Sequence, residues 1–110
     1  MASVSVKKLR ARAKLSQESL ANLLGTSWVS VSRWERSVAK PGPETRARIE
    51  RLGKLVDRIG GALPAEELPR FLQTPQPLLR GYRPADLLQS GYAFEDLLAF
   101  VESAKSGDMA

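Results

Sequence analysis

The stretch that most constrains the fold of this chain is residues 16–36, which reads as two short helices joined by a tight turn. Ser16 is a good N-cap, because its hydroxyl can accept a hydrogen bond from an otherwise unpaired backbone N–H of the first turn. Leu15 and Leu20 flank this cap with the spacing of a hydrophobic staple. The sequence therefore predicts a helix that begins just after Ser16 and ends at Gly25, a residue that tolerates positive φ.

A second helix is expected almost at once, from about Ser27 to Arg36, because Ser27 offers another N-cap. On this helix Val31 and Trp34 share one face, which we expect to pack on the core. The other face remains available for recognition of another molecule. It carries Trp28, Val29, Ser32, Arg33 and Arg36.

The charges of the chain are divided unevenly between its two halves. Residues 1–58 hold thirteen basic and five acidic residues, a net charge of +8, whereas residues 59–110 hold four basic and seven acidic residues, a net charge of −3. A basic half that contains a helix pair suits a phosphate backbone, since Lys and Arg release condensed counterions when they bind it. The plainer interpretation is that these basic side chains are simply solvated on exposed helix faces.

Composition argues against an enzyme. The 110 residues include no cysteine and no histidine, which removes disulfides, most zinc and iron sites, and thiol or imidazole catalysis. The carboxylate pairs Glu66–Glu67 and Glu95–Asp96 are adjacent in sequence and would point apart on a helix, and no Gly-rich phosphate loop occurs. We expect no catalytic activity, no metal and no cofactor.

No apolar run approaches membrane-spanning length, and the N-terminus is too short and polar for a signal sequence, so a cytoplasmic location is expected.

The segment from Leu9 to Val56 closely resembles the Xre-type, phage repressor-like helix-turn-helix domain. The features that carry the resemblance are LSQESLANLLG, then TSWVSVSRWER, a Pro/Gly loop and a last amphipathic helix. That last helix is expected from Pro43, which suits a first helical turn, to about Ile59, with a kink or break at Gly53 as an alternative.

The first helix, expected over residues 4–14, places Arg10 on its core-facing side. Arginine is rarely buried without a partner, so a carboxylate should meet it, and Glu35 is the candidate. The family resemblance supports this pairing, which we expect to be structural.

For DNA binding, the second motif helix is expected to lie in the major groove. Arg33 is the best reader, because a guanidinium can reach guanine O6 and N7 together, and a phosphate contact is the alternative. Trp28 and Val29 could touch a thymine methyl group, although Trp28 could instead turn into the core.

The remaining candidates would contact the DNA backbone. Gln17 and Ser30 are expected to contact phosphates and to set the register without reading sequence. Lys40, in the loop after the second motif helix, suits a backbone contact, and a solvated lysine is the alternative. One such domain buries little surface, so we expect two copies on a palindromic site, through dimerisation or bridging by a partner.

The predicted fold class is all-α, with a helix-turn-helix domain at residues 1–60 and a second small helical domain at residues 61–110. Gly60 and Gly61 close the first domain as a natural hinge. Prolines then recur and forbid any long helix until Ser90, so short helices are expected at Pro69 and Pro84. The final helix, Tyr92 to about Ala104, has so narrow a polar stripe that we expect burial on more than one side, with another protein or a second copy as the cover.

The segment from about Leu68 to Gly107 contains Phe71-Leu72, the segment from Pro75 to Gly81, Pro84 and Asp86-Leu87-Leu88. By these features it resembles the C-terminal toxin-binding domain of the Xre/MbcA/ParS antitoxin family, with Arg80 in place of the first glycine of the usual pair. The resemblance implies an antitoxin that binds a RES-domain toxin, an NAD-consuming enzyme, and blocks its active site. The expected toxin-binding residues are Leu79, Arg80, Gly81, Tyr82, Arg83, Phe94, Leu98, Val101 and Lys105.

Two alternatives remain for the second half. Leu79 and Tyr82 could simply pack this small domain. The half as a whole could be a plain dimerisation element, which would make the protein a solitary transcriptional regulator.

Overall fold

The computed structural model of the chain describes residues 5–107, and every regular element over this range is a helix. The prediction of an all-α fold is therefore confirmed for the part of the chain that the structure describes. The molecule is elongated, with principal extents of 47 × 27 × 25 Å. The elements in chain order are α1 Val6–Arg12, α2 Gln17–Leu24, α3 Trp28–Glu35, α4 Pro43–Ile59, η1 Ala65–Glu67, α5 Leu68–Gln73, η2 Pro77–Leu79, η3 Pro84–Leu88 and α6 Gly91–Ser106, where η marks a 3₁₀ helix.

Local capping chemistry sets the first helix boundaries. The Ser16 hydroxyl accepts a hydrogen bond from the backbone N–H of Ser19 at 3.0 Å, and α2 ends at Gly25 in the left-handed conformation, with φ of 72°. The Ser27 hydroxyl caps α3 in the same way. These three predictions are confirmed. The first helix is shorter than expected, because Ser5 caps α1 and the chain leaves the helix after Arg12; residue 4 lies outside the described range.

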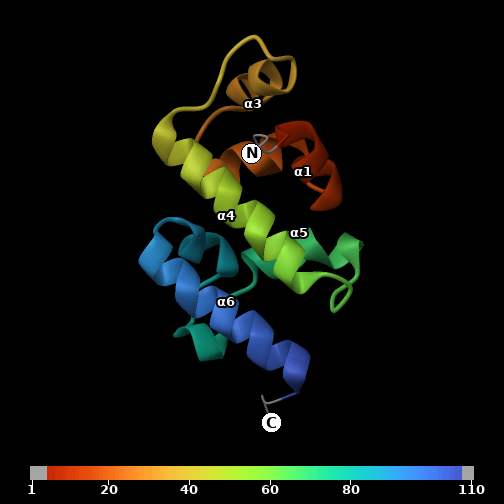
Figure 1. The fold of residues 1–110 in the computed structure, drawn as a ribbon, viewed down its shortest axis with the longest axis vertical. Coiled ribbons are helices and arrows are strands. Elements are labelled where there is room, and N and C mark those ends of the chain that lie inside the picture. The colour runs from red at the N-terminus through yellow and green to blue at the C-terminus, as the bar shows by residue number, and fades with distance from the viewer. Residues whose placement is uncertain (1–4, 108–110) are drawn as a thin grey trace.

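Helix α4 is the longest element and runs the predicted course from Pro43 to Ile59. It continues through Gly53 without the break that the sequence allowed, and a Cβ atom at this glycine would meet nothing within 4 Å. The helix crosses the middle of the molecule and contacts elements of both halves, α1 and α2 on one side and α6 and η3 on the other (Figure 1).

The two halves share one continuous hydrophobic core around α4. Polar contacts also cross the Gly60–Gly61 boundary. Arg51 Nη1 donates to the backbone carbonyl of Leu88 at 2.9 Å, and Lys105 Nζ donates to the carbonyl of Arg58 at 2.7 Å. Helix α4 therefore packs against elements of both halves.

The short helices of the second half follow its prolines. Pro69 lies in the first turn of α5, and Pro84 begins η3, both as predicted. Ser90 caps α6, because its hydroxyl accepts a hydrogen bond from the backbone N–H of Ala93 at 3.2 Å. Among residues 5–107, no helix is both long and apolar enough to cross a membrane.

Candidate DNA and partner interfaces

Helix α3 presents two different faces, as its sequence predicts. Val31 is fully buried, and Trp34 is half-buried against the core. Trp28 and Val29 are 52% and 46% exposed, and Arg33 is exposed as well. Trp28 therefore points outward, which decides between the two orientations that the sequence left open.

A polar network fixes the end of α3 to the helices that support it. Arg10 Nε donates to Glu35 Oε2 at 2.6 Å, and Arg10 Nη2 donates to Glu35 Oε1 at 3.1 Å, so the predicted pair is confirmed as a bidentate one. Arg10 Nη1 also donates to the carbonyl of Leu15 at 3.1 Å. The hydrogen bonds from Arg10 lower the pKa of Glu35 below its ordinary value, against the opposing effect of burial. The pair ties α1, the turn after it and α3 into one unit.

Gln17 belongs to the same network, a role that sequence reasoning missed. Its Nε2 donates to Glu35 Oε1 at 3.1 Å, and this hydrogen bond also lowers the pKa of Glu35. The amide oxygen of Gln17 is still able to accept a hydrogen bond, and its other amide hydrogen is able to donate one. The contact thus orients the residue at the start of α2, beside the end of α3.

The other two predicted backbone contacts lie on either side of α3. Ser30 is half-buried in its first turn, with its Oγ 3.3 Å from Ser27 Oγ. Lys40 is exposed in the loop after α3, at the edge of a hollow of about 490 Å³ that Lys7 and Arg46 also line. Lys7 and Arg46 come from α1 and α4, so the fold gathers three cations beside α3 that the sequence does not place together.

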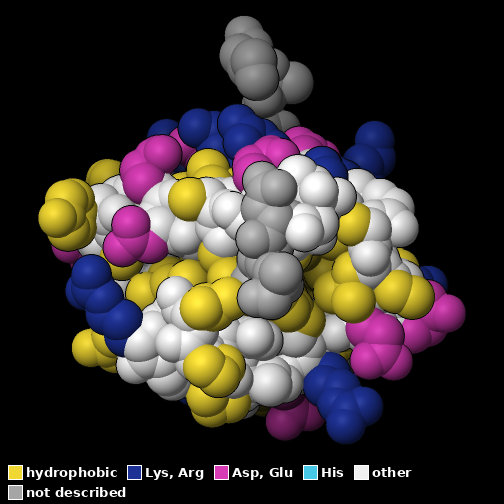
Figure 2. All heavy atoms as spheres, turned by 90° about the horizontal axis from the view of Figure 1, so that it is seen from below, with side chains coloured by type: hydrophobic (Ala, Val, Ile, Leu, Met, Phe, Trp, Pro, Cys, Tyr) yellow, Lys and Arg dark blue, Asp and Glu magenta, His cyan; other side chains and the backbone are white. Residues whose placement is uncertain are grey.

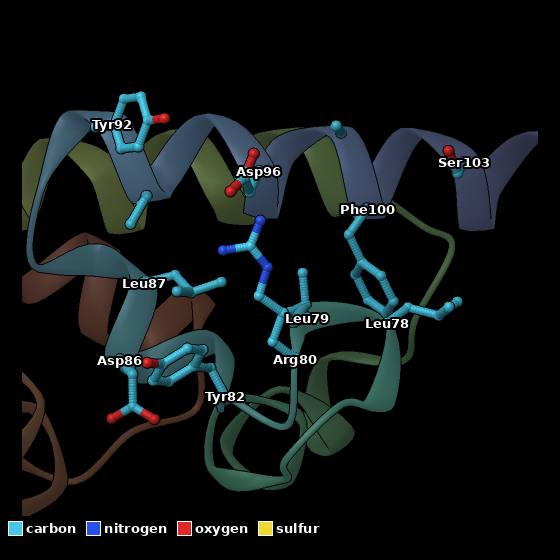
Figure 3. Close-up of a pocket in the computed structure, with 12 residues that line it drawn as sticks. Leu78, Leu79, Arg80, Tyr82, Asp86, Leu87, Tyr92, Asp96, Phe100 and Ser103 are labelled. Carbon is cyan, nitrogen blue, oxygen red and sulfur yellow. The ribbon is translucent and has the colours of Figure 1, made fainter.

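A second hollow lies in the C-terminal half, between α6 and the turn at residues 76–82. This groove has a volume of about 620 Å³ (Figure 3). Three of its side chains are large, apolar and exposed: Leu78 is 68% exposed, Tyr82 53% and Tyr92 90%. Sequence reasoning named Tyr82 but missed the other two, because the groove forms only when α6 packs across the turn. Figure 2, which views the molecule from below, shows hydrophobic side chains across the middle of this end and most charged side chains near its rim.

The turn beneath the groove has an unusual backbone. Arg80 and Gly81 both lie in the left-handed region, with φ of 60° and 81°. Hydrogen bonds hold the turn closed: the N–H groups of Leu79 and Gly81 both donate to the carbonyl of Gln76, and the N–H of Gln76 donates to the carbonyl of Tyr82.

Four of the residues expected to bind a partner are buried in the chain's own core. These are Leu79, Phe94, Leu98 and Val101, none of which is more than 8% exposed. The last three occupy one face of α6, which packs on α4 and η3. The expectation that these four side chains contact a partner directly is therefore corrected, since another protein cannot reach them without opening the core. The cover expected for this face of α6 comes from the chain itself.

The charged residues among the candidates differ in whether they form hydrogen bonds or ion pairs within the described part of the chain. Arg83 forms an ion pair with Asp86 at 2.7 Å, and its Nη1 donates to Gln73 at 2.6 Å, while the pair lowers the pKa of Asp86. Lys105 is exposed and bound to the carbonyl of Arg58. Arg80 and Gly81 are exposed, and Arg80 lines the groove.

Comparison with known proteins supports both halves. The helix-turn-helix family model matches residues 6–58. The chain is 26% identical over 96 residues to "Mycobacterial cidal antitoxin MbcA" of Mycobacterium bovis and to the same protein of Mycobacterium tuberculosis, an alignment that covers 87% of this chain and 84% of each relative. A chain of the crystal structure of the M. tuberculosis MbcT-MbcA toxin-antitoxin complex has the same fold, with a TM-score of 0.81, 24% identity, and coverage of 96% of this chain and 95% of that one. Residues 6–58 therefore match the helix-turn-helix family model, and the chain is similar to the mycobacterial MbcA antitoxins over both of its halves.

Proposed function

We propose that this chain is the antitoxin of a toxin-antitoxin pair and represses its own operon by binding DNA. The observation that carries the proposal is the extent of the similarity to MbcA, which covers 87% of this chain and so includes both halves. A regulator that shared only the DNA-binding domain would match over the first half alone. We propose that residues 1–60 bind DNA and that residues 61–110 bind the toxin, both in the cytoplasm, and that the chain has no enzymatic activity of its own.

The proposed DNA interface is centred on the exposed face of α3. In the major groove, Arg33 would donate to guanine O6 and N7, and Trp28 and Val29 would contact thymine methyl groups. Ser30, Gln17 and Lys40 would contact phosphates and fix the register. The network around Glu35 supports this role, because it holds the end of α3 and the start of α2 in one fixed arrangement.

The proposed toxin interface is the groove between α6 and the turn at residues 76–82. Its exposed apolar side chains, Leu78, Tyr82 and Tyr92, would be buried against the toxin. Arg80, Gly81 and Arg83 lie on or beside the turn, and Lys105 lies near the end of α6. We propose that the toxin is a RES-domain enzyme that consumes NAD, and that this surface covers its active site.

The two proposed interfaces lie far apart, which makes simultaneous binding sterically feasible. Helix α3 and helix α6 lie toward opposite ends of the long axis (Figure 1), and that axis measures 47 Å. The toxin could therefore bind without displacing DNA, and a toxin that bound two copies of the chain would supply the pair of DNA-binding domains that a palindromic operator needs.

The test is a crossed pair of surface variants, assayed with the product of the neighbouring gene. Tyr82→Ser with Tyr92→Ser should abolish copurification with that product and rescue of growth, yet leave operator binding intact. Trp28→Ser with Val29→Ser should weaken operator binding and leave the partner complex intact. All four side chains are about half exposed or more, so neither double variant opens the core. If the tyrosine variant still neutralises the toxin fully, the proposed toxin interface is wrong.

A second function is favoured by the same exposed tyrosines. A groove with Tyr82 and Tyr92 on its rim could equally pair with a second copy, which would make the chain a solitary dimeric regulator. Sedimentation of the purified chain, alone and with the neighbouring gene product, separates the two: a homodimer that the tyrosine variant dissociates and that ignores the neighbour supports the regulator.

A further inference from the structure

The backbone at Arg80 is unfavourable for the residue that occupies it. With φ of 60° and ψ of 28°, it lies in the left-handed region, where the Cβ atom of an L-residue comes too close to the following carbonyl oxygen. Glycine adopts this conformation without that cost. The turn leaves no freedom to avoid it, because the N–H of Arg80 donates to the carbonyl of Pro77 at 3.1 Å and the N–H groups on both sides donate to Gln76.

No polar contact of the Arg80 side chain offsets this backbone cost within the described part of the chain. The side chain is exposed, and it makes no hydrogen bond or ion pair with any residue between 5 and 107. Arg83, three residues later, is by contrast bound to both Asp86 and Gln73. Arg80 is therefore an exposed cation at an unfavourable backbone position, with no polar partner among the described residues, and its guanidinium is available to a group from another molecule.

Arg80 lies in the groove between α6 and the turn at residues 76–82. Arg80 is the only cation among the described residues that line the groove, which the exposed apolar side chains of Leu78, Tyr82 and Tyr92 also line. Figure 3 shows its guanidinium extending from the turn toward Asp96 on α6, with no ion pair between them. A partner group that enters the groove therefore meets a guanidinium that has no ion pair among the described residues, in a groove lined by both apolar and acidic side chains.

We propose, resting on the toxin-binding function proposed above, that Arg80 is the residue that selects the toxin, by binding a carboxylate which the toxin presents among apolar side chains. A guanidinium offers a carboxylate two parallel hydrogen bonds, and such bonds strengthen when the apolar surroundings exclude water. The other acidic residue at the groove, Asp86, is already neutralised by Arg83, so it does not compete for Arg80. Among the described residues that line the groove, Asp96 is the carboxylate that faces Arg80 (Figure 3).

The chain provides a matched control for the test. Lys14 is also an exposed cation with positive φ, 57°, but it lies in the turn between α1 and α2, outside the groove. Arg80→Gly and Lys14→Gly should each raise Tm by about 2 to 4 °C, because each relieves the same backbone cost, partly offset by the greater freedom of glycine in the unfolded chain. Only Arg80→Gly should weaken the complex with the neighbouring gene product, by roughly 10-fold or more, as expected for the loss of a charge-assisted pair.

The measurement is isothermal titration of the purified neighbouring gene product into each full-length variant. Equal affinity of Arg80→Gly and the wild type would overturn the proposal and leave the antitoxin assignment standing, whereas no binding by the wild type would overturn both. Asp96→Asn should bind as tightly as the wild type or more tightly, since it removes a carboxylate that competes for Arg80. A loss for Asp96→Asn equal to that for Arg80→Gly would show that the groove does not receive a carboxylate.

Discussion

Replacing Glu35 by glutamine should destabilise the protein far more than its position at the end of a short helix suggests. The side chain of Glu35 is 7% exposed and that of Arg10 is 24% exposed, so the substitution leaves a largely buried guanidinium without its counterion. Breaking a fully buried pair costs about 3–5 kcal/mol, and the partial exposure of Arg10 reduces this to about 2 kcal/mol. With an unfolding entropy of about 2.1 cal/mol/K per residue, this chain should lose about 9 °C in Tm.

A matched control separates this effect from the loss of any ion pair. Arg12 and Asp57 form a pair of which the two side chains are 52% and 66% exposed. Asp57→Asn should therefore cost only about 0.5 kcal/mol, or about 2 °C. Thermal unfolding followed by circular dichroism at pH 7 measures both variants under the same conditions.

The pH dependence supplies an independent check on Glu35. Because hydrogen bonds from Arg10 hold the pKa of Glu35 below its unfolded value, the ionised carboxylate stabilises the fold above about pH 4, and this stabilisation is lost as the pH falls through the lowered pKa. The deficit of Glu35→Gln should therefore be full at pH 7 and shrink in stronger acid. A deficit no larger than that of Asp57→Asn, or one that stays constant down to pH 2.5, would refute the reasoning.

Three further predictions concern residues of α3 and α4. Arg33→Ala should cost about 1 to 3 kcal/mol on the cognate operator and flatten the preference at one base pair in a competition binding assay, whereas an equal loss on random DNA would indicate a phosphate contact. Gly53→Ala should raise the stability to urea by about 0.5 to 1 kcal/mol, since its Cβ has free space inside α4, and any decrease would contradict this. Arg51→Ala should lower the stability to urea by about 1 kcal/mol by removing the hydrogen bond to the Leu88 carbonyl, and an unchanged stability would contradict this.

Most helix boundaries could be predicted from the sequence because they depend on local chemistry. Three helices are capped by the hydroxyl of the serine that precedes them: Ser16, Ser27 and Ser90. Pro43 begins α4, because a proline suits the first turn of a helix. The pairing of Arg10 with a carboxylate followed from the cost of burying a lone cation. The direction of Trp28 could not be predicted, since an exposed and a buried tryptophan fit the same helical spacing.

The partner surface was harder to predict because it depends on contacts between distant segments. Phe94, Leu97, Leu98 and Val101 follow one another at the spacing of a single helix face, and this regularity indicates that one face of α6 is buried. The sequence shows that these residues are apolar, but not which element covers them. The groove itself appears only when α6 lies across the turn that contains Arg80.

The central claim, that the two ends of one chain bind DNA and a toxin separately, is tested most directly by a gel-shift titration with both partners present. Operator DNA bound by the chain should shift further when the neighbouring gene product is added, because α3 and α6 lie toward opposite ends of the 47 Å axis. Release of free DNA in proportion to the added protein would contradict the claim, as it would show that the two partners compete for one surface.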